Sequence, residues 1–212
     1  MDERPDLPAA TWLATAERVQ RGLNHDLSNR TAALAAVVEL RDGVDHGLLT
    51  RLDDEVGRLG TLLRLMRLLP RAPHAPAEPV MADDVVPDVL ALVGCIAEFR
   101  DAAVRAVPLG GVPPLRCRPL ALQHALLLLL VAVGDAGGGL SLDVTHDDAA
   151  VTFGIGTSAG SPLDAPGSGD ALAAVAAHLM GDDGALVWTA EAGYRLRLPT
   201  LTALRARARA RA

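Results

Sequence analysis

The chain has 212 residues, of which 50% are hydrophobic and only 2% aromatic, and its formal net charge is -6. This length and apolar content exclude a mostly disordered chain and predict one large domain or two small ones with an aliphatic core. The acidic balance argues against general binding of nucleic acid. The sequence contains no lysine, which excludes lysine-based chemistry such as Schiff-base formation.

Three features favour a cytoplasmic protein without membrane contact. The N-terminus, Met1-Asp2-Glu3-Arg4-Pro5, lacks the features of a signal peptide. The longest apolar run, residues 125–133, is about half of the ~20 residues that a membrane helix needs, so we expect a buried helix there. Cys95 and Cys117 lack the spacing of metal ligands, and we interpret them as reduced structural thiols.

Residues 7–41 have the pattern of one long helix. One face of this helix forms a seam that consists of Ala16, Gln20, Leu23, Leu27, Leu34 and Val38. His25 lies about 200° around the helix from both Leu23 and Leu27, so we expect its side chain to point away from the seam. Four polar residues share the face of His25, at spacings of three, four or seven: Arg18, Arg21, Ser28 and Asn29.

A second helix is expected over residues 48–69, after a loop with two glycines at residues 42–47. Its apolar residues alternate spacings of three and four, which is heptad patterning: Leu49, Leu52, Val56, Leu59, Leu63 and Met66. Two helices with narrow apolar stripes cannot bury those stripes as an isolated hairpin. We therefore predict a homodimer through residues 7–69, with two hairpins forming a four-helix bundle.

The rest of the chain predicts a second domain. A proline-rich segment, residues 71–80, is the expected linker between a first domain at 1–70 and a second at 81–200. Helical patterns cover residues 85–103, 119–136 and 170–180, a short strand is expected at 104–107 and a turn at 110–114, and strand hairpins are expected at 140–155 and 185–198. The arginine-rich tail, residues 201–212, is expected to be a solvated, frayed terminus.

Four motifs make this order of elements recognisable. They are His25-Asp26-Leu27-Ser28-Asn29, residues 123–136, Gly167-Ser168-Gly169 with the helix that follows, and the closing hairpin at 184–199. Over residues 10–199 the chain resembles a sensor histidine kinase core. The resemblance implies an α+β protein, in which a dimerising, histidine-bearing hairpin precedes a two-layer α/β sandwich of the kinase/gyrase/Hsp90 ATP-binding type.

The sequence departs from that family where ATP would bind. The family's magnesium-ligating asparagine corresponds to Ala132, and the preceding asparagine position holds Leu128; hydrocarbon side chains cannot bind a hard cation. The aspartate that contacts adenine falls at or near Thr157, and the lid segment contains no arginine. Phosphoryl transfer from ATP depends on such positioning, so we expect no nucleotide or metal cofactor and no ATP-dependent kinase activity.

This pattern is similar to histidine phosphotransferases that descend from kinases and keep a degenerate ATP-binding domain. The resemblance implies that His25 accepts a phosphoryl group, Asp26 assists proton removal and Asn29 orients a water. We expect Arg18, Arg21 and Ser28 to help bind response-regulator receiver domains, which would supply the magnesium. Three alternatives stay open: an active or divergent kinase, a non-catalytic pseudokinase adaptor, and a receiver phosphatase using Asn29. His124 is interpreted as a packed structural histidine.

Overall fold

The structure is a computed structural model that describes residues 7–39, 46–69, 76–100, 105–106, 111–136, 139–157, 169–181, 184–189 and 193–211. Residues 42–45 of the expected loop, residues 71–75 of the proline-rich linker and the lid segment at 158–168 lie outside these residues. His46 and Gly47, which were expected in the loop, are helical.

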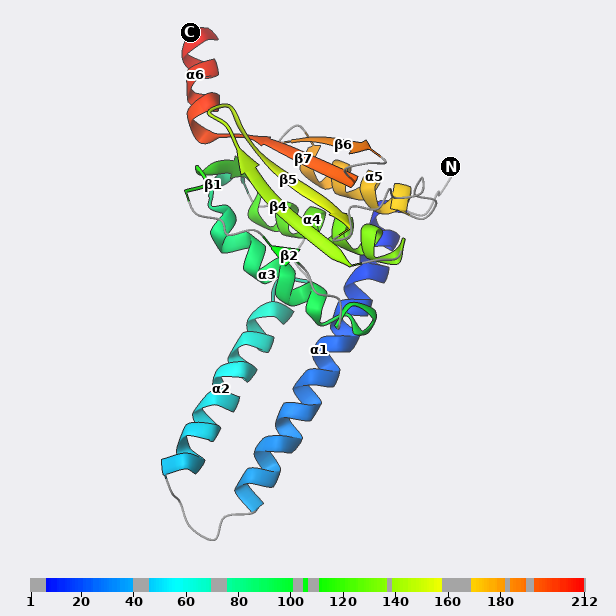
Figure 1. The fold of residues 1–212 in the computed structure, drawn as a ribbon, viewed down its shortest axis with the longest axis vertical. Helices are drawn as coiled ribbons and strands as arrows, with labels where there is room; N and C mark the ends of the chain where they lie inside the picture. The colour runs from blue at the N-terminus through cyan, green and yellow to red at the C-terminus, as the bar shows by residue number, and fades with distance from the viewer. Residues whose placement is uncertain are drawn as a thin grey trace.

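The described elements are, in chain order, α1 (Leu7–Glu39), α2 (His46–Met66), β1 (Glu78–Val80), α3 (Ala82–Gly94), η1 (Ala97–Phe99), β2 (Arg105–Ala106), β3 (Leu115–Cys117), α4 (Pro119–Asp135), β4 (Leu140–His146), β5 (Ala150–Thr157), α5 (Gly169–Met180), β6 (Ala185–Thr189), β7 (Gly193–Pro199) and α6 (Leu201–Arg211). Helix α1 and helix α2 form an antiparallel hairpin that projects from an α/β body (Figure 1). The expected fold class, α+β with a helical hairpin followed by a two-layer sandwich, is confirmed. No helix among the described residues is both long and apolar enough to cross a membrane.

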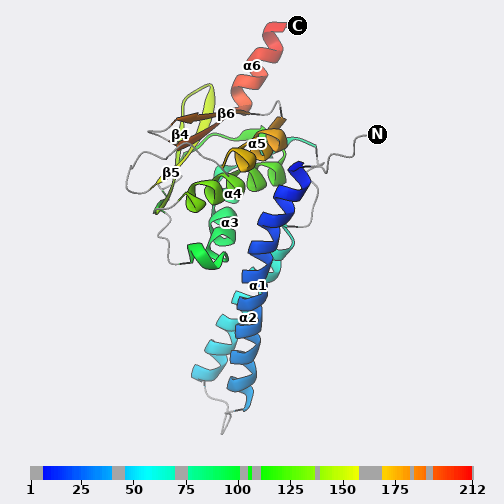
Figure 2. The same ribbon diagram turned by 90° about the vertical axis from the view of Figure 1, so that its right-hand side faces the viewer.

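Five strands form the main sheet, in the order β2-β4-β5-β7-β6. Only the β2–β4 pair is parallel, and the other three pairs are antiparallel. Helices α3, α4 and α5 cover one face of this sheet, and the N-terminal half of α1 packs on the helical layer from the side away from the sheet (Figures 1 and 2). The first helix is therefore shared between the hairpin and the body.

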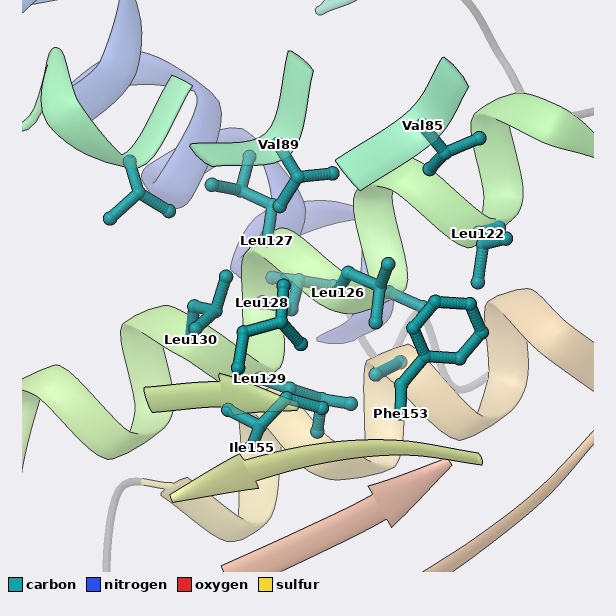
Figure 3. Packing of buried hydrophobic residues seen from close by; sticks show 14 of the residues in the cluster. Val85, Val89, Leu122, Leu126, Leu127, Leu128, Leu129, Leu130, Phe153 and Ile155 are labelled. Carbon is teal, nitrogen blue, oxygen red and sulfur yellow. The ribbon is translucent and has the colours of Figure 1, made fainter. Parts of the chain in front are cut away.

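Helix α4 forms the centre of the body and is buried on every side. All residues from Ala121 to Val133 are buried, as expected for a helix surrounded by other elements. On one side Leu126 and Leu129 lie toward the sheet residues Phe153 and Ile155, and on another Leu127 lies beside Val89 of α3 (Figure 3).

The side of α4 that faces the hairpin carries His124. Its ring stacks on Trp12 of α1 at a centroid distance of 3.8 Å, and its Nε2 donates to the carbonyl of Leu68 at 2.9 Å. Burial lowers the pKa of His124, and the hydrogen bond to Leu68 opposes this effect. A neutral imidazole thus joins both ends of the hairpin to the core, in keeping with a packed structural role.

The structure differs from the sequence-based expectations at four elements. Helix α3 runs from Ala82 to Gly94 and does not continue to residue 103. Strands β1 and β3 form a separate two-stranded antiparallel sheet that the sequence patterns did not indicate, because each strand has only three residues. The arginine-rich tail is the helix α6, whose first turn is capped by Thr200: its Oγ1 accepts the Ala203 N–H at 3.1 Å.

Candidate functional site

His25 lies in the middle of α1, where the hairpin leaves the body. Its side chain is 58% exposed, whereas Leu23 of the seam is fully buried. The burial of the seam residues depends on where they lie along α1. Leu23 packs into the body, while Val38, toward the far end of the hairpin, is 51% exposed. His25 is thus accessible to a partner while the helix that carries it is anchored.

Two neighbours on α1 contact the imidazole ring. The Asp26 Oδ1 atom lies 3.1 Å from His25 Nδ1, and the Asn29 Nδ2 atom lies 3.3 Å from Nδ1 and 3.4 Å from Nε2. An ionised carboxylate only accepts hydrogen bonds, so its pairing with Nδ1 places the proton on that nitrogen. Nε2 then carries the free lone pair, and the amide of Asn29 lies within reach of it.

A third contact comes from the α/β body. Arg100, directly after η1, donates from Nη2 to Asp26 Oδ1 at 3.0 Å, although the two residues are 74 positions apart. No motif or periodicity marks Arg100 in the sequence, and we did not predict it as a site residue. Asp26 therefore lies between a ring nitrogen of its own helix and a guanidinium of the body.

The three residues expected to bind a partner differ in their surroundings. Arg18 is turned toward the body: it donates to both carboxylate oxygens of Asp135 at 3.0 and 3.1 Å, and its guanidinium lies 5.3 Å from the centre of the Phe99 ring. Arg21 is 76% exposed and lies 3.8 Å from Glu17 on its own helix. Ser28 is exposed and donates to the Asn24 carbonyl. Arg21 and Ser28 thus stay on the surface around His25, while Arg18 fastens α1 to the body; their role toward a partner stays a prediction.

Two depressions border the site, and Arg100 lines both. One, of about 210 Å³, is lined by Arg18, Arg21, Gly22, His25, Ala97, Glu98 and Arg100. The other, of about 400 Å³, is lined by Asp26, Asn29, Arg30, Gly94 and Arg100. The first is mainly basic, with three guanidinium groups against one carboxylate, and this composition suits an anionic group beside the ring.

Arg30 directly follows Asn29 on α1. It donates from Nη1 to both carboxylate oxygens of Glu55 on α2, at 3.1 and 3.2 Å. Arg58 also pairs with Glu55, at 2.6 Å. This small network joins the two helices of the hairpin one turn beyond His25.

A close backbone approach positions the body against the histidine. A Cβ atom on Gly22 would lie 1.6 Å from the carbonyl oxygen of Cys95, so only glycine permits this contact. Burial, and next the charge of Asp26, raise the pKa of the Cys95 thiol to about 11, with Arg100 opposing the shift. Cys95 is therefore a neutral packing residue, consistent with the structural interpretation of this cysteine.

We expect Gly22→Ala to lower the free energy of unfolding by about 1–3 kcal/mol, since the new methyl group forces the α3–η1 corner away from α1. The matched control is Gly57→Ala in α2, where a Cβ meets nothing within 4 Å. That change should stabilise the protein by about 0.5–1 kcal/mol through helix propensity alone. Urea unfolding of both variants measures the difference. Equal stabilisation by the two substitutions would show that the Gly22–Cys95 contact is not made in solution.

Leu128 and Ala132, the two positions that the sequence resemblance places at metal-binding asparagines, both lie inside the core. Leu128 is fully buried and Ala132 is 3% exposed. By helical geometry, Leu128 and Ala132 share one face of α4 with Ala121 and Ala125. The other faces of α4 point to the sheet, to α3 and to Trp12. Helix α5 packs along α4, and it is the element that remains to cover this face. No oxygen or nitrogen atom is presented by either side chain.

Comparison with known proteins returned likenesses of fold only. No family model matches the sequence, and no curated protein matches it. Among solved structures, the chain is similar to a histidine kinase from Burkholderia phymatum STM815, with 15% identity over 94% of this chain and 99% of that chain and a TM-score of 0.45. It is also similar to the Acinetobacter baumannii histidine kinase AdeS, with 15% identity over 86% and 97% of the two chains and a TM-score of 0.41.

A third similar structure is the cytoplasmic segment of the histidine kinase QseC, with 16% identity over 76% of this chain and 98% of that chain and a TM-score of 0.39. These scores leave the function to be inferred from the residues of the site.

Proposed function

We propose that this chain is a histidine phosphotransfer protein of a two-component phosphorelay. The observation that carries the proposal is the arrangement of His25: an exposed imidazole whose Nδ1 is paired with Asp26, so that the nucleophilic lone pair lies on Nε2, where its neighbour on the helix is the Asn29 amide at 3.4 Å.

In the forward step, the Nε2 lone pair attacks the phosphorus of an aspartyl phosphate on a receiver domain. The N–P bond forms as the P–O bond to the aspartate breaks, and the aspartate leaves as a carboxylate that retains the bonding electron pair. Asp26 stabilises the positive charge that develops on the ring by accepting the Nδ1–H hydrogen bond. The reverse of this step passes the phosphoryl group to a second receiver. Magnesium belongs to the receiver's site in both directions.

The core positions of α4 support phosphotransfer over an ATP-dependent kinase. A kinase of this type holds the ATP phosphates through a metal ion, and the corresponding side chains here are those of Leu128 and Ala132, which are buried hydrocarbon. The phosphoryl group then has to come from another protein.

The surface of the hairpin supports assembly of two copies. In the single chain, Leu49, Val56 and Leu63 of α2 are 52%, 58% and 49% exposed and recur every seven residues. The alternate positions of the heptad pattern, Leu52 and Leu59, are half-buried. A stripe with this repeat is the contact surface of a coiled coil, and a second hairpin would cover it.

The proposal is tested by offering the purified chain two phosphoryl donors. One is a panel of isotopically phosphorylated receiver domains from the same genome, and the other is labelled ATP with magnesium. We expect label to move from at least one receiver to the chain and none from ATP. Labelling by ATP alone would establish a kinase instead. A chain that accepts label from no receiver but shortens the lifetime of a phosphorylated one would be a receiver phosphatase.

A further inference from the structure

We propose that Arg100 of the α/β body is a positioning residue for His25. By holding the Asp26 carboxylate, it keeps the ring proton on Nδ1 and leaves Nε2 as the nitrogen that attacks phosphorus. This inference rests on the proposed phosphotransfer function and deepens it, because it adds a residue from the α/β body to a site whose other members all lie on α1.

The geometry joins three groups through one oxygen atom. Asp26 Oδ1 accepts from Arg100 Nη2 at 3.0 Å and lies 3.1 Å from His25 Nδ1. The chain of contacts therefore runs from guanidinium to carboxylate to imidazole. A carboxylate that accepts from Nδ1–H orients the ring in other histidine sites, and here Arg100 in turn holds that carboxylate. Without Arg100, the half-exposed Asp26 side chain is free to leave the ring for water.

Stability does not account for this ion pair. The side chains of Arg100 and Asp26 are 42% and 30% exposed, and pairs this open to solvent contribute little to folding. The body is held on the hairpin at other points, among them the Gly22–Cys95 contact, the Arg18–Asp135 pair and the pairing of Arg64 with Asp88. Arg100 is therefore not needed to dock the body, and its contact with Asp26 is free to serve the histidine.

This role gives the α/β body a function in phosphotransfer that does not require it to bind ATP. Because Arg100 directly follows η1, it reaches Asp26 only while the α3–η1 corner is packed against α1 at Gly22. The reactivity of His25 therefore depends on the α/β body being packed against α1. Arg100 and Arg21 also line the basic depression beside the ring, and their guanidinium groups are donors suited to a phosphoryl group on His25.

The first experiment reads the proton position directly. Two-bond ¹H–¹⁵N correlation spectra of the ¹⁵N-labelled full chain at pH 8 report the tautomer of each neutral histidine, and the His25 signals are assigned by their loss in His25→Gln. We expect the Nδ1–H tautomer at His25 in the wild type and a shift toward Nε2–H in Arg100→Met. Arg205→Met on the distant helix α6 is the control and should leave the tautomer unchanged.

The second experiment measures reactivity without a partner protein. Phosphoramidate supplies the phosphoryl group: Nε2 attacks phosphorus, the P–N bond of the donor breaks and ammonia leaves. We expect Arg100→Met to slow phosphorylation of His25 by about tenfold and Arg100→Lys to restore part of the rate, since lysine keeps the charge but not the planar donor geometry. In an Asp26→Asn background, Arg100→Met should have no further effect, because the two residues act through one contact.

The outcomes separate this inference from the proposed function. An unchanged tautomer and an unchanged phosphoramidate rate in Arg100→Met, with receiver transfer intact in the wild type, would overturn the role of Arg100 alone. A wild type that reacts with phosphoramidate in an Arg100-dependent way but with no receiver would overturn the phosphorelay and leave the positioning contact standing. An additive effect of the two substitutions would show that Arg100 acts other than through Asp26.

Discussion

His25→Gln is expected to abolish acceptance of a phosphoryl group from a phosphorylated receiver. Glutamine keeps the polarity and the helix propensity of the position but has no nucleophilic ring nitrogen, so the N–P bond cannot form. The loss should be complete within the detection limit of labelling, while the far-ultraviolet circular dichroism and the unfolding midpoint stay near those of the wild type, since the His25 side chain is 58% exposed.

The matched control is His146→Gln, at the exposed end of β4. It removes a histidine from the same chain and should leave labelling unchanged. Acceptance of label by His25→Gln at the wild-type level would place the phosphoacceptor elsewhere and would remove the basis of the proposed function.

Val56→Asp is expected to convert a dimer of this chain to a monomer. Val56 is 58% exposed in the single chain and lies in the middle of the stripe formed with Leu49 and Leu63. An unpaired carboxylate at a coiled-coil seam costs on the order of 3 kcal/mol or more, which raises the dissociation constant at least about a hundredfold. Sedimentation velocity over a range of concentrations measures this change.

Val187→Asp on β6 provides the matched control, since Val187 is 56% exposed in the single chain and belongs to the sheet at the other end of the molecule. The same substitution there should leave the oligomeric state as it is in the wild type. A wild-type chain that sediments as a monomer at all concentrations would contradict the four-helix bundle, and equal effects of the two substitutions would locate the interface away from the hairpin.

The sequence patterns were most informative where structure follows from short-range periodicity. The 3.6-residue repeat predicted α1 and α2 to within three residues at each described end, and the alternating pattern of residues 140–155 predicted the β4–β5 hairpin. Where the chain forms pieces of only three residues, such as β1 and β3, there is no period to detect, and these were missed. The continuous apolar run of α4 indicated a buried helix but not which neighbours cover its sides.

By itself, the sequence determined the local part of the site. Asp26 and Asn29 lie one and four residues after His25, and on a helix these spacings bring side chains to the same ring whatever the rest of the chain does. The sequence also determined that positions 128 and 132 carry hydrocarbon side chains, because the residue types Leu128 and Ala132 are read directly from it.

Only the tertiary structure decided which groups of the α/β body reach the histidine. The contacts Arg100–Asp26 and Arg18–Asp135 join residues 74 and 117 positions apart, and the first depends on the close approach of the Cys95 carbonyl to Gly22. No periodicity encodes such contacts, since they arise from the way one packed unit sits on another. The neighbours of His25 on α1 therefore follow from the local sequence, whereas the contact of Arg100 with Asp26 follows from the packing of the α/β body on α1.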